Sequence, residues 1–508
     1  MKRLNIGCTL FYSALCLCTL SFLNTSQACQ NTPTNKQKLI QTIDYVEQMG
    51  REIYCYWDLK KEHDQVNWQD IIKQAKSKVS DTTTQEEFQE ILNRIAAGVH
   101  DGHVNYIYQS KHKPFYLPIE FKKLEDGYYV KQVEQEKLWP ITSEITPGDK
   151  VLAINDIPIE QFIEEREKII SGSTAIGRQS KAASSLNSLP RYVSAPANNH
   201  TLTVEKYLSK IRHDVTIPWV TYSESQNGDK ALSDIVQSQI LPENVGLLKL
   251  TSMHHATGQQ SHIRYIQKEL KALKNTDALI IDVRNNGGGY GEIGDAVIAH
   301  FIKQPVKRYK AQLKNSTQAI YARPGLLEVF TQTDPDSYEY SEWVDYDIEP
   351  LNKKAPVYSK PVYILTNERC FSACDTFVDS FSSNHLGEVL GHQTGGGTGY
   401  PLWFELPYEQ GHFRFSILRG YSNHDRFLEG IGTLPDKEFY ATPGDLYNEI
   451  DGELVRAYHY VLGQLQQDAS GLTPQMVSHE ALFKNKKTDG VIPFFEEEMQ
   501  WQEAQKHY

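Results

Sequence analysis

The most constraining feature of this 508-residue chain is an apolar run that ends in three consecutive glycines. Residues 278–283 read ALIIDV, a short run whose length and composition predict a fully buried strand. It leads into Gly287, Gly288 and Gly289, which permit positive φ angles and close backbone approach. Neighbouring N–H groups in such a loop can converge on one point, as in an oxyanion hole. A phosphate-binding loop is disfavoured because the Gly-Lys-Ser/Thr ending is missing, and a plain turn stays the simpler alternative.

Strands and helices alternate on both sides of this run. Further apolar strands are predicted at 246–250 and 361–365, with a helix at 262–273 and another after the last strand. The alternation predicts an α/β layer whose sheet is at least partly parallel. We place this core at residues 221–466, with a polar and aromatic insertion near 305–357.

Two different patterns precede the core. Residues 29–105 carry apolar residues at helical spacing, with a capping box at Thr84-Gln-Glu-Glu87, and predict a small helical domain. Residues 106–220 contain short alternating runs typical of strands. Within them, ITPGDKVLAINDIPI at 145–159 resembles a PDZ domain, a fold that binds extended peptides by strand addition. A PDZ-like fold without a peptide-binding role is the alternative. Residues 172–200, rich in Ser, Asn and Ala, are predicted to form a flexible surface insert.

The two ends of the chain are predicted to lie outside the fold. A short basic start, a largely apolar stretch and small residues up to Ala28 are typical of a secretory signal peptide, so we predict cleavage of residues 1–28. A retained anchor is the alternative. Lipid attachment at Cys29 is less favoured, because Ser26 stands where a lipoprotein signal usually has Leu. We therefore predict an exported protein, periplasmic or secreted, with no transmembrane span in the mature chain. The polar tail at 467–508 is assigned no role.

Composition excludes several classes of function. The chain has 52 Lys and Arg against 64 Asp and Glu, a net charge of −12, which disfavours binding to nucleic acid. Four cysteines remain in the predicted mature chain, and their pairing is not readable from sequence; they are Cys29, Cys55, Cys370 and Cys374. Neither Cys-x-x-Cys nor His-Glu-x-x-His occurs. We predict neither a metal nor an organic cofactor.

Two further strings place reactive side chains at predicted structural boundaries. Ser372 follows the strand at 361–365 where a helix is expected to begin, so its hydroxyl is exposed and the helix N-terminus adds positive potential. Serine also commonly caps helices in such a place. His103 ends the string GVHDGH after the helical region, close to Asp101, where a surface loop is the simple alternative. Taken singly, each string favours the structural alternative.

Taken together and in this order, the strings resemble the C-terminal processing, or tail-specific, peptidase superfamily. Its members share Asp-x-Arg-x-Asn-x-Gly-Gly, found here at 282–289, and a nucleophile turn, here Ser372-Ala373. They also share a Gly-x-x-Thr-x-Gly loop, here 391–396, and a late glycine string ending in Pro-Asp, here 430–436. The resemblance covers about residues 40–465. It implies an α/β catalytic core with a ClpP/crotonase-like mixed sheet, an N-terminal helical domain and a β-rich PDZ-like domain.

The superfamily has two catalytic arrangements, and the sequence favours one. The first uses a Ser–Lys dyad with Lys about 25 residues after Ser, but no Lys occurs between Ser372 and Lys437. The second is that of the tricorn protease core, and its three positions carry His103, Ser372 and Glu429. This resemblance implies that Ser372 attacks a peptide carbonyl and His103 takes its proton, while Glu429 orients His103.

The same resemblance implies the oxyanion hole and the substrate. Its donors are predicted to be the N–H groups of Gly288 and Ala373, with Gly287 as a nearby alternative. We predict an exported serine-type peptidase that acts on a peptide or protein substrate, engaged in part by the PDZ-like domain. The alternatives are catalytically inactive proteins on the same fold, one binding a lipophilic ligand and the other a peptide.

One position departs from the second arrangement. Its pattern has a serine immediately before the histidine that helps to place the carboxylate, whereas this chain has Gly102. We therefore name Asp101 as a supporting residue and His100 as its alternative for this task.

Overall fold

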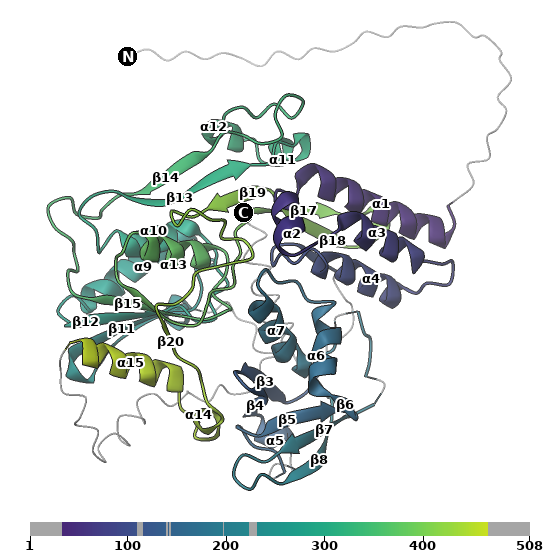
Figure 1. Cartoon of the computed structure of the whole chain (residues 1–508), viewed down its shortest axis with the longest axis horizontal. Helices are drawn as coiled ribbons and strands as arrows, with labels where there is room; N and C mark the ends of the chain where they lie inside the picture. Colours follow the sequence, from purple (N-terminus) through teal and green to yellow (C-terminus); the bar gives the residue numbers. More distant parts are fainter. Residues whose placement is uncertain are drawn as a thin grey trace, which may run out of the picture.

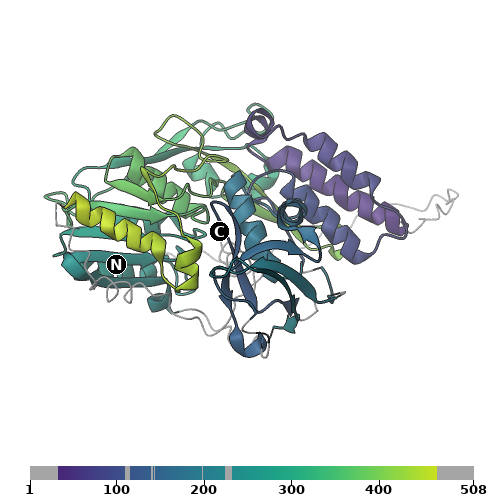
Figure 2. The same cartoon turned by 60° about the horizontal axis from the view of Figure 1, so that its bottom comes forward.

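The computed structural model describes residues 33–108, 115–138, 141, 144–190, 192–196, 198–222 and 231–465 (Figure 1). The predicted signal peptide at 1–28, the predicted lipid-attachment position Cys29 and the polar tail at 467–508 lie outside the described residues. No helix in the described ranges is long and apolar enough to cross a membrane. Figures 1 and 2 show a helical region and a small β-rich unit next to a larger α/β core.

The α/β core is built on a six-stranded mixed sheet with the order β10-β11-β12-β15-β16-β20. Strand β10 is antiparallel to β11, and the remaining neighbours are parallel. Every residue of β12 and β15 is buried, because helices cover both faces of the sheet. Side chains of α9, α10 and α13 pack on one face and those of α15 on the other. The predicted parallel α/β layer is confirmed.

The bounds of the core elements follow the predicted strands and helices closely. The elements are α8 Leu232–Ile235, β10 Val236–Leu241, β11 Val245–Leu250, α9 Gln259–Ala272, β12 Ala278–Asp282, α10 Gly291–Ile298, β15 Val362–Thr366, α13 Ala373–Ser383, β16 Glu388–Gly391, β20 Lys437–Glu438, α14 Pro443–Tyr447 and α15 Gly452–Gln464. The predicted insertion contains the antiparallel pair β13 and β14, and β13 also pairs with β19. Its elements are β13 Val306–Leu313, α11 Thr317–Ala322, α12 Leu326–Val329 and β14 Val344–Ile348, and the partner strand outside the insertion is β19 Leu418–Tyr421.

The N-terminal helices share their hydrophobic core with strands from the far end of the chain. Buried side chains of these helices form one cluster with side chains of β13, β18 and the residues that follow β18. The capping box at the start of the fourth helix is confirmed, since Thr84 N donates to Glu87 Oε2 at 2.8 Å and Glu87 N to Thr84 Oγ1 at 3.2 Å. The elements are α1 Asn35–Ile53, α2 Trp57–His63, α3 Trp68–Ser77, α4 Gln85–Ala97, β1 Asn105–Ile107, β17 Pro401–Glu405 and β18 His412–Ser416.

The β-rich unit has the strand order β3-β4-β5-β7-β8. A turn follows β5, where Asn155 has φ 50° and Asp156 has φ 64°. Asn and Asp tolerate this left-handed region better than most residues. The elements are β2 Phe115–Tyr116, β3 Ile119–Leu124, β4 Gly127–Val133, α5 Gln135–Leu138, β5 Lys150–Ile154, β6 Ile157–Pro158, α6 Ile159–Glu167, α7 Ala175–Ser184, β7 His200–Glu205, β8 Arg212–Ile217 and β9 Val220–Thr221.

The prediction of a flexible surface insert at 172–200 is wrong for its first half. Residues 175–184 form helix α7, which packs beside β3, and Ala182, Ala183 and Leu186 belong to the core of the β-rich unit. The small side chains that suggested a loop instead let the helix approach the sheet closely. The loop before α7 consequently enters the protein interior, with Ser173 only 2% exposed.

Candidate active site

Ser372 sits in a sharp turn between strand β15 and helix α13. Its φ of 58° and ψ of −119° fall outside the favoured regions for a side chain with a Cβ atom. Such a conformation persists only where the surrounding structure imposes it, and it is a feature of exposed nucleophiles at strand-to-helix turns. Ser372 makes no side-chain cap to α13, so the simple capping alternative is not supported. Its hydroxyl lies at the positive end of the helix.

His103 faces this hydroxyl. The side chain is fully buried, and its Nε2 lies 3.0 Å from Ser372 Oγ. The ring packs against Phe371, with 4.6 Å between ring centroids. Burial, with the nearby charges of Arg414 and Lys181, lowers the pKa of His103 well below its usual range. The imidazole is therefore neutral at physiological pH, as a proton acceptor must be.

Two buried carboxylates lie beside His103. Asp101 Oδ1 accepts the His103 N–H at 2.7 Å and lies 3.9 Å from Nδ1, while Asp101 Oδ2 accepts the Ser416 hydroxyl at 2.9 Å. Glu429 Oε1 forms an ion pair with Lys60 Nζ at 2.8 Å. Ligand atoms of Asp101, His103 and Glu429 all lie within 4.8 Å of one another. Such a group of atoms has the chemistry to hold a metal, but Lys60 already supplies a cation here.

Ser173 provides a hydroxyl at the place where the sequence has Gly102 instead of serine. Its Oγ accepts the Gly102 N–H at 2.9 Å, and its side chain hydrogen-bonds Glu429. A Cβ atom on Gly102 would lie 2.5 Å from Phe371 Cζ, so no side chain fits there. Sequence reasoning named Asp101 and His100 as substitutes and missed Ser173, because it lies 71 residues away in a segment predicted to be a surface insert.

The glycine-rich stretch 394–399 packs against the ring of Phe371. A Cβ atom on Gly397 would lie 1.9 Å from the Phe371 ring, which explains why the Lys of the Ser–Lys branch has no counterpart at this position. Asp375, in the first turn of α13, accepts the N–H groups of Gly396 at 3.2 Å and Gly397 at 2.8 Å. Burial raises the pKa of Asp375 to about 7. Asp375 therefore connects helix α13 to residues 396–397 by hydrogen bonds.

The predicted oxyanion loop lies against the nucleophile turn. Gly288 has φ 96°, and a Cβ atom added to it would lie 2.8 Å from both Ala373 N and Ser372 Cβ. The Gly288 N–H donates to Asn286 Oδ1 at 2.9 Å. The N–H of Ala373, the first residue of α13, has no acceptor among the described residues. The two predicted donors are thus adjacent, but only Ala373 has its N–H available in this structure.

Cys370 and Cys374 form a disulfide that brackets Ser372, with 5.4 Å between their Cα atoms. Both are fully buried. The sequence left the pairing of the cysteines open, so this bond was not predicted. Cys55 is a buried free thiol.

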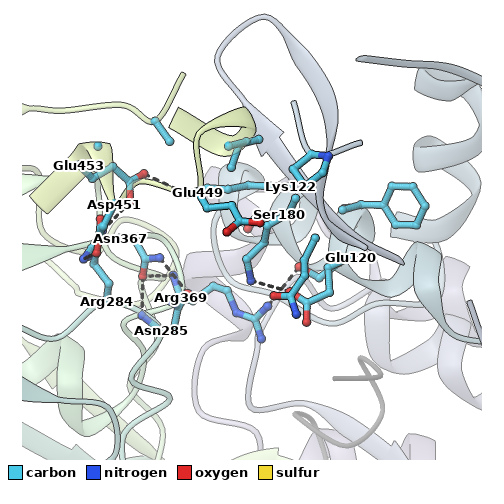
Figure 3. A pocket seen from close by; sticks show the side chains of 18 of the residues that line it. Glu120, Lys122, Ser180, Arg284, Asn285, Asn367, Arg369, Glu449, Asp451 and Glu453 are labelled. Carbon is cyan, nitrogen blue, oxygen red and sulfur yellow. Dashed lines mark hydrogen bonds and ion pairs between the residues drawn. The ribbon is translucent and has the colours of Figure 1, made fainter. Parts of the chain in front are cut away.

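A cavity of about 850 Å³ opens between the β-rich unit and the core (Figure 3). Its lining includes Asn367 and Arg369, just before the nucleophile turn, but neither Ser372 nor His103. Figure 3 shows Asn367 joined to Asn285, and the hydrogen bond measures 3.0 Å. Across the cavity, Lys122 Nζ lies 3.2 Å from Glu453 Oε1. Polar residues of both units line the cavity, which extends from β3 to residues 367–369, just before Ser372.

Comparison with known proteins agrees with this geometry. Residues 244–439 match peptidase family S41, and residues 113–227 match a PDZ domain. The match to peptidase family S41 covers the α/β core from β11 to β20. This family lies in the tail-specific protease superfamily, whose members are serine peptidases, and the PDZ-containing architecture predicted from the sequence is confirmed.

The following proteins are similar to this chain at low sequence identity. A protein of Chlamydia trachomatis serovar D is 26% identical over 216 residues, which cover 34% of this chain and 36% of the relative. The chain thus matches about a third of that relative's length. The structure of mature CPAF has a TM-score of 0.68 at 17% identity and covers 88% of this chain and 99% of its own. Mature CPAF complexed with lactacystin has a TM-score of 0.67 at 17% identity, covering 87% and 99%. At this identity the likeness establishes the shared fold.

Proposed function

We propose that this protein hydrolyses peptide bonds with Ser372 as nucleophile, His103 as general base and Glu429 as the carboxylate that supports His103. The observation that carries the proposal is the 3.0 Å separation between His103 Nε2 and Ser372 Oγ, with the serine in a strained turn at a helix N-terminus. Two residues 269 positions apart have been brought to hydrogen-bonding distance in the interior. That arrangement is the requirement for activating a serine hydroxyl.

The reaction follows from these contacts. His103 accepts the Ser372 proton while Oγ forms a bond to the substrate carbonyl carbon, and the resulting imidazolium is stabilised by the carboxylates of Asp101 and Glu429. His103 then donates that proton to the leaving amine as the C–N bond breaks. A water molecule repeats the sequence to release the acyl group from Ser372. Asp101, through its hydrogen bond to the His103 backbone, fixes the position of the base.

The negative charge on the substrate oxygen needs donors in place before the reaction. We assign the first donor to the Ala373 N–H, at the positive end of α13. The second is the Gly288 N–H, which has to turn from Asn286 Oδ1 toward the substrate, with Gly287 as the neighbouring alternative.

We infer that the substrate is a peptide or an unfolded segment of a protein, held by the PDZ domain and led to Ser372 past the cavity in Figure 3. PDZ domains bind extended peptides at a sheet edge, and β3 is an edge strand of this sheet that faces α7. The sequence-based assignment of an exported protein, periplasmic or secreted, belongs to the same proposal.

The test is active-site labelling with a fluorophosphonate, followed by cleavage assays with a peptide library. Wild-type protein is expected to be labelled on Ser372, and both Ser372→Ala and His103→Ala to lose labelling while remaining folded by circular dichroism. Labelling that survives His103→Ala would assign the base to another residue. A folded wild-type protein that is neither labelled nor active on peptides would overturn the peptidase proposal and favour the ligand-binding alternative.

A further inference from the structure

Lys60 is a buried cation that the proposed reaction does not yet use. It lies in helix α2 and is 1% exposed. Its ammonium group has three partners, which are Glu429 Oε1 at 2.8 Å, Asp64 Oδ2 at 3.2 Å and the carbonyl oxygen of His100 at 2.6 Å. An ammonium group has three protons to donate, so all are used. Lys60 is therefore held in one position, next to the carboxylate assigned to His103.

The surroundings of Glu429 contain one cation and several acidic groups. Burial and the charge of Asp101 raise the pKa of Glu429 to about 8, while Lys60 and the hydrogen bond from Ser173 oppose that rise. Thr398 N donates to Glu429 Oε2 at 3.3 Å. Titratable and charged groups from three segments face this site. Helix α2 and its C-cap contribute Lys60 and Asp64, and the loop before β1 contributes His100, Asp101 and His103. The segment before α2 contributes Tyr54, Cys55 and Tyr56, and the pKa values of these last three groups are raised well above their usual range.

We propose that Lys60 is a positioning residue of this active site, whose buried ammonium favours the ionised form of Glu429 and fixes its carboxyl group beside Asp101 and His103. The inference rests on the proposed function of Ser372, His103 and Glu429. Two buried carboxylates close together cannot both stay ionised without a compensating charge, and one of them takes up a proton. Lys60 supplies that charge and fixes Glu429 Oε1 in space.

The consequence is a defined effect on pH dependence. An ionised Glu429 supports the imidazolium of the transition state, so activity rises as pH rises through the pKa of Glu429. An opposite charge at this range shifts a carboxyl pKa by about 1–3 units. Without Lys60, the acid limb of the labelling rate is expected to move up by about that amount, which makes labelling about 10- to 1,000-fold slower at a fixed pH on the limb.

The experiment measures the second-order rate of fluorophosphonate labelling between pH 6 and 10.5 in four proteins: wild type, Lys60→Met, Glu429→Gln and the double variant. Lys61→Met is the matched control, because Lys61 is the exposed next residue of the same helix. Lys60→Met is expected to lose rate at pH 7 and to regain it toward pH 10. Its effect should vanish in the Glu429→Gln background, where no carboxylate remains for Lys60 to act on.

Two results would overturn the proposal. One is a Lys60→Met rate that is reduced equally at every pH, and the other is a further loss when Lys60→Met is added to Glu429→Gln. Thermal unfolding of the same four proteins separates this failure from failure of the proposed function. If Lys60 and Glu429 are coupled, the double variant at pH 10 melts higher than Lys60→Met, in which Glu429 ionises without its partner, whether or not the wild type reacts with the probe. If the double variant melts no higher than Lys60→Met, that result alone refutes the assignment of Lys60.

Discussion

Replacing Cys370 and Cys374 by serine tests how the fold holds Ser372 in its unusual conformation. The disulfide closes a loop with a sequence separation of 4, and Ser372 is the middle residue of that loop. For so short a loop the chain-entropy relation gives a constraint of about 2 kcal/mol. The φ of 58° at Ser372 costs about 1–3 kcal/mol. The bond acts by restricting the opened conformations of this segment. Its effect is of the same size as the strain, so the bond contributes a large part of what keeps the turn at Ser372 closed.

The expected result is slower labelling in a protein that is still folded. If losing about 2 kcal/mol lets the turn relax, the reactive conformation becomes less populated by up to about 30-fold. The fluorophosphonate labelling rate of the Cys370→Ser/Cys374→Ser variant should fall by a similar factor, with a fall in Tm of no more than about 8 °C. Wild-type protein reduced with dithiothreitol should show the same loss, once mass spectrometry after alkylation confirms two new thiols.

The control is Cys55→Ser, which removes the buried free thiol and leaves the disulfide in place. This variant should respond to the reductant as the wild type does, whereas the Cys370→Ser/Cys374→Ser variant should not respond. A double variant that labels within about twofold of wild type would refute the reasoning, because the turn would then be held by its packing alone.

Three further predictions concern neighbouring residues. Gly102→Ser, which restores the serine of the related pattern, should slow labelling by about 100-fold, because its Cβ would lie 2.5 Å from Phe371 Cζ; a faster variant would contradict the placement of Phe371. Ser173→Ala should slow labelling by about threefold to tenfold, the range expected for loss of a hydrogen bond worth about 1 kcal/mol, while Ser171→Ala serves as its control and an unchanged rate would remove Ser173 from the site. Burial raises the pKa of Asp375 to about 7, so this group stabilises the fold below about pH 4 and loses that contribution as pH rises to about 7. Asp375→Asn should flatten the decline of Tm between pH 4 and 7, and a decline as steep as in wild type would contradict that pKa.

Much of the fold and the candidate nucleophile Ser372 follow from local pattern. Local sequence identifies the buried strand 278–282 with its glycine loop, and also the serine after the strand 362–366. This is possible because apolar runs indicate buried strands and glycines indicate turns. The turn at Asn155 and Asp156 was predictable for the same reason. His103 needed more than pattern, since only the resemblance to a family connected it with Ser372.

The sequence by itself determined the alternation of elements and the order of the motifs, and it singled out Ser372 and His103 as candidate site residues. Tertiary structure decided what surrounds them: Ser173 in place of a missing hydroxyl, Lys60 against Glu429, and the disulfide across Ser372. The physical reason is that periodicity records which face of an element is buried, but not which distant element covers it. Lys60 and Glu429 are separated by hundreds of residues, and they meet because the N-terminal helices share one core with β18 and β13.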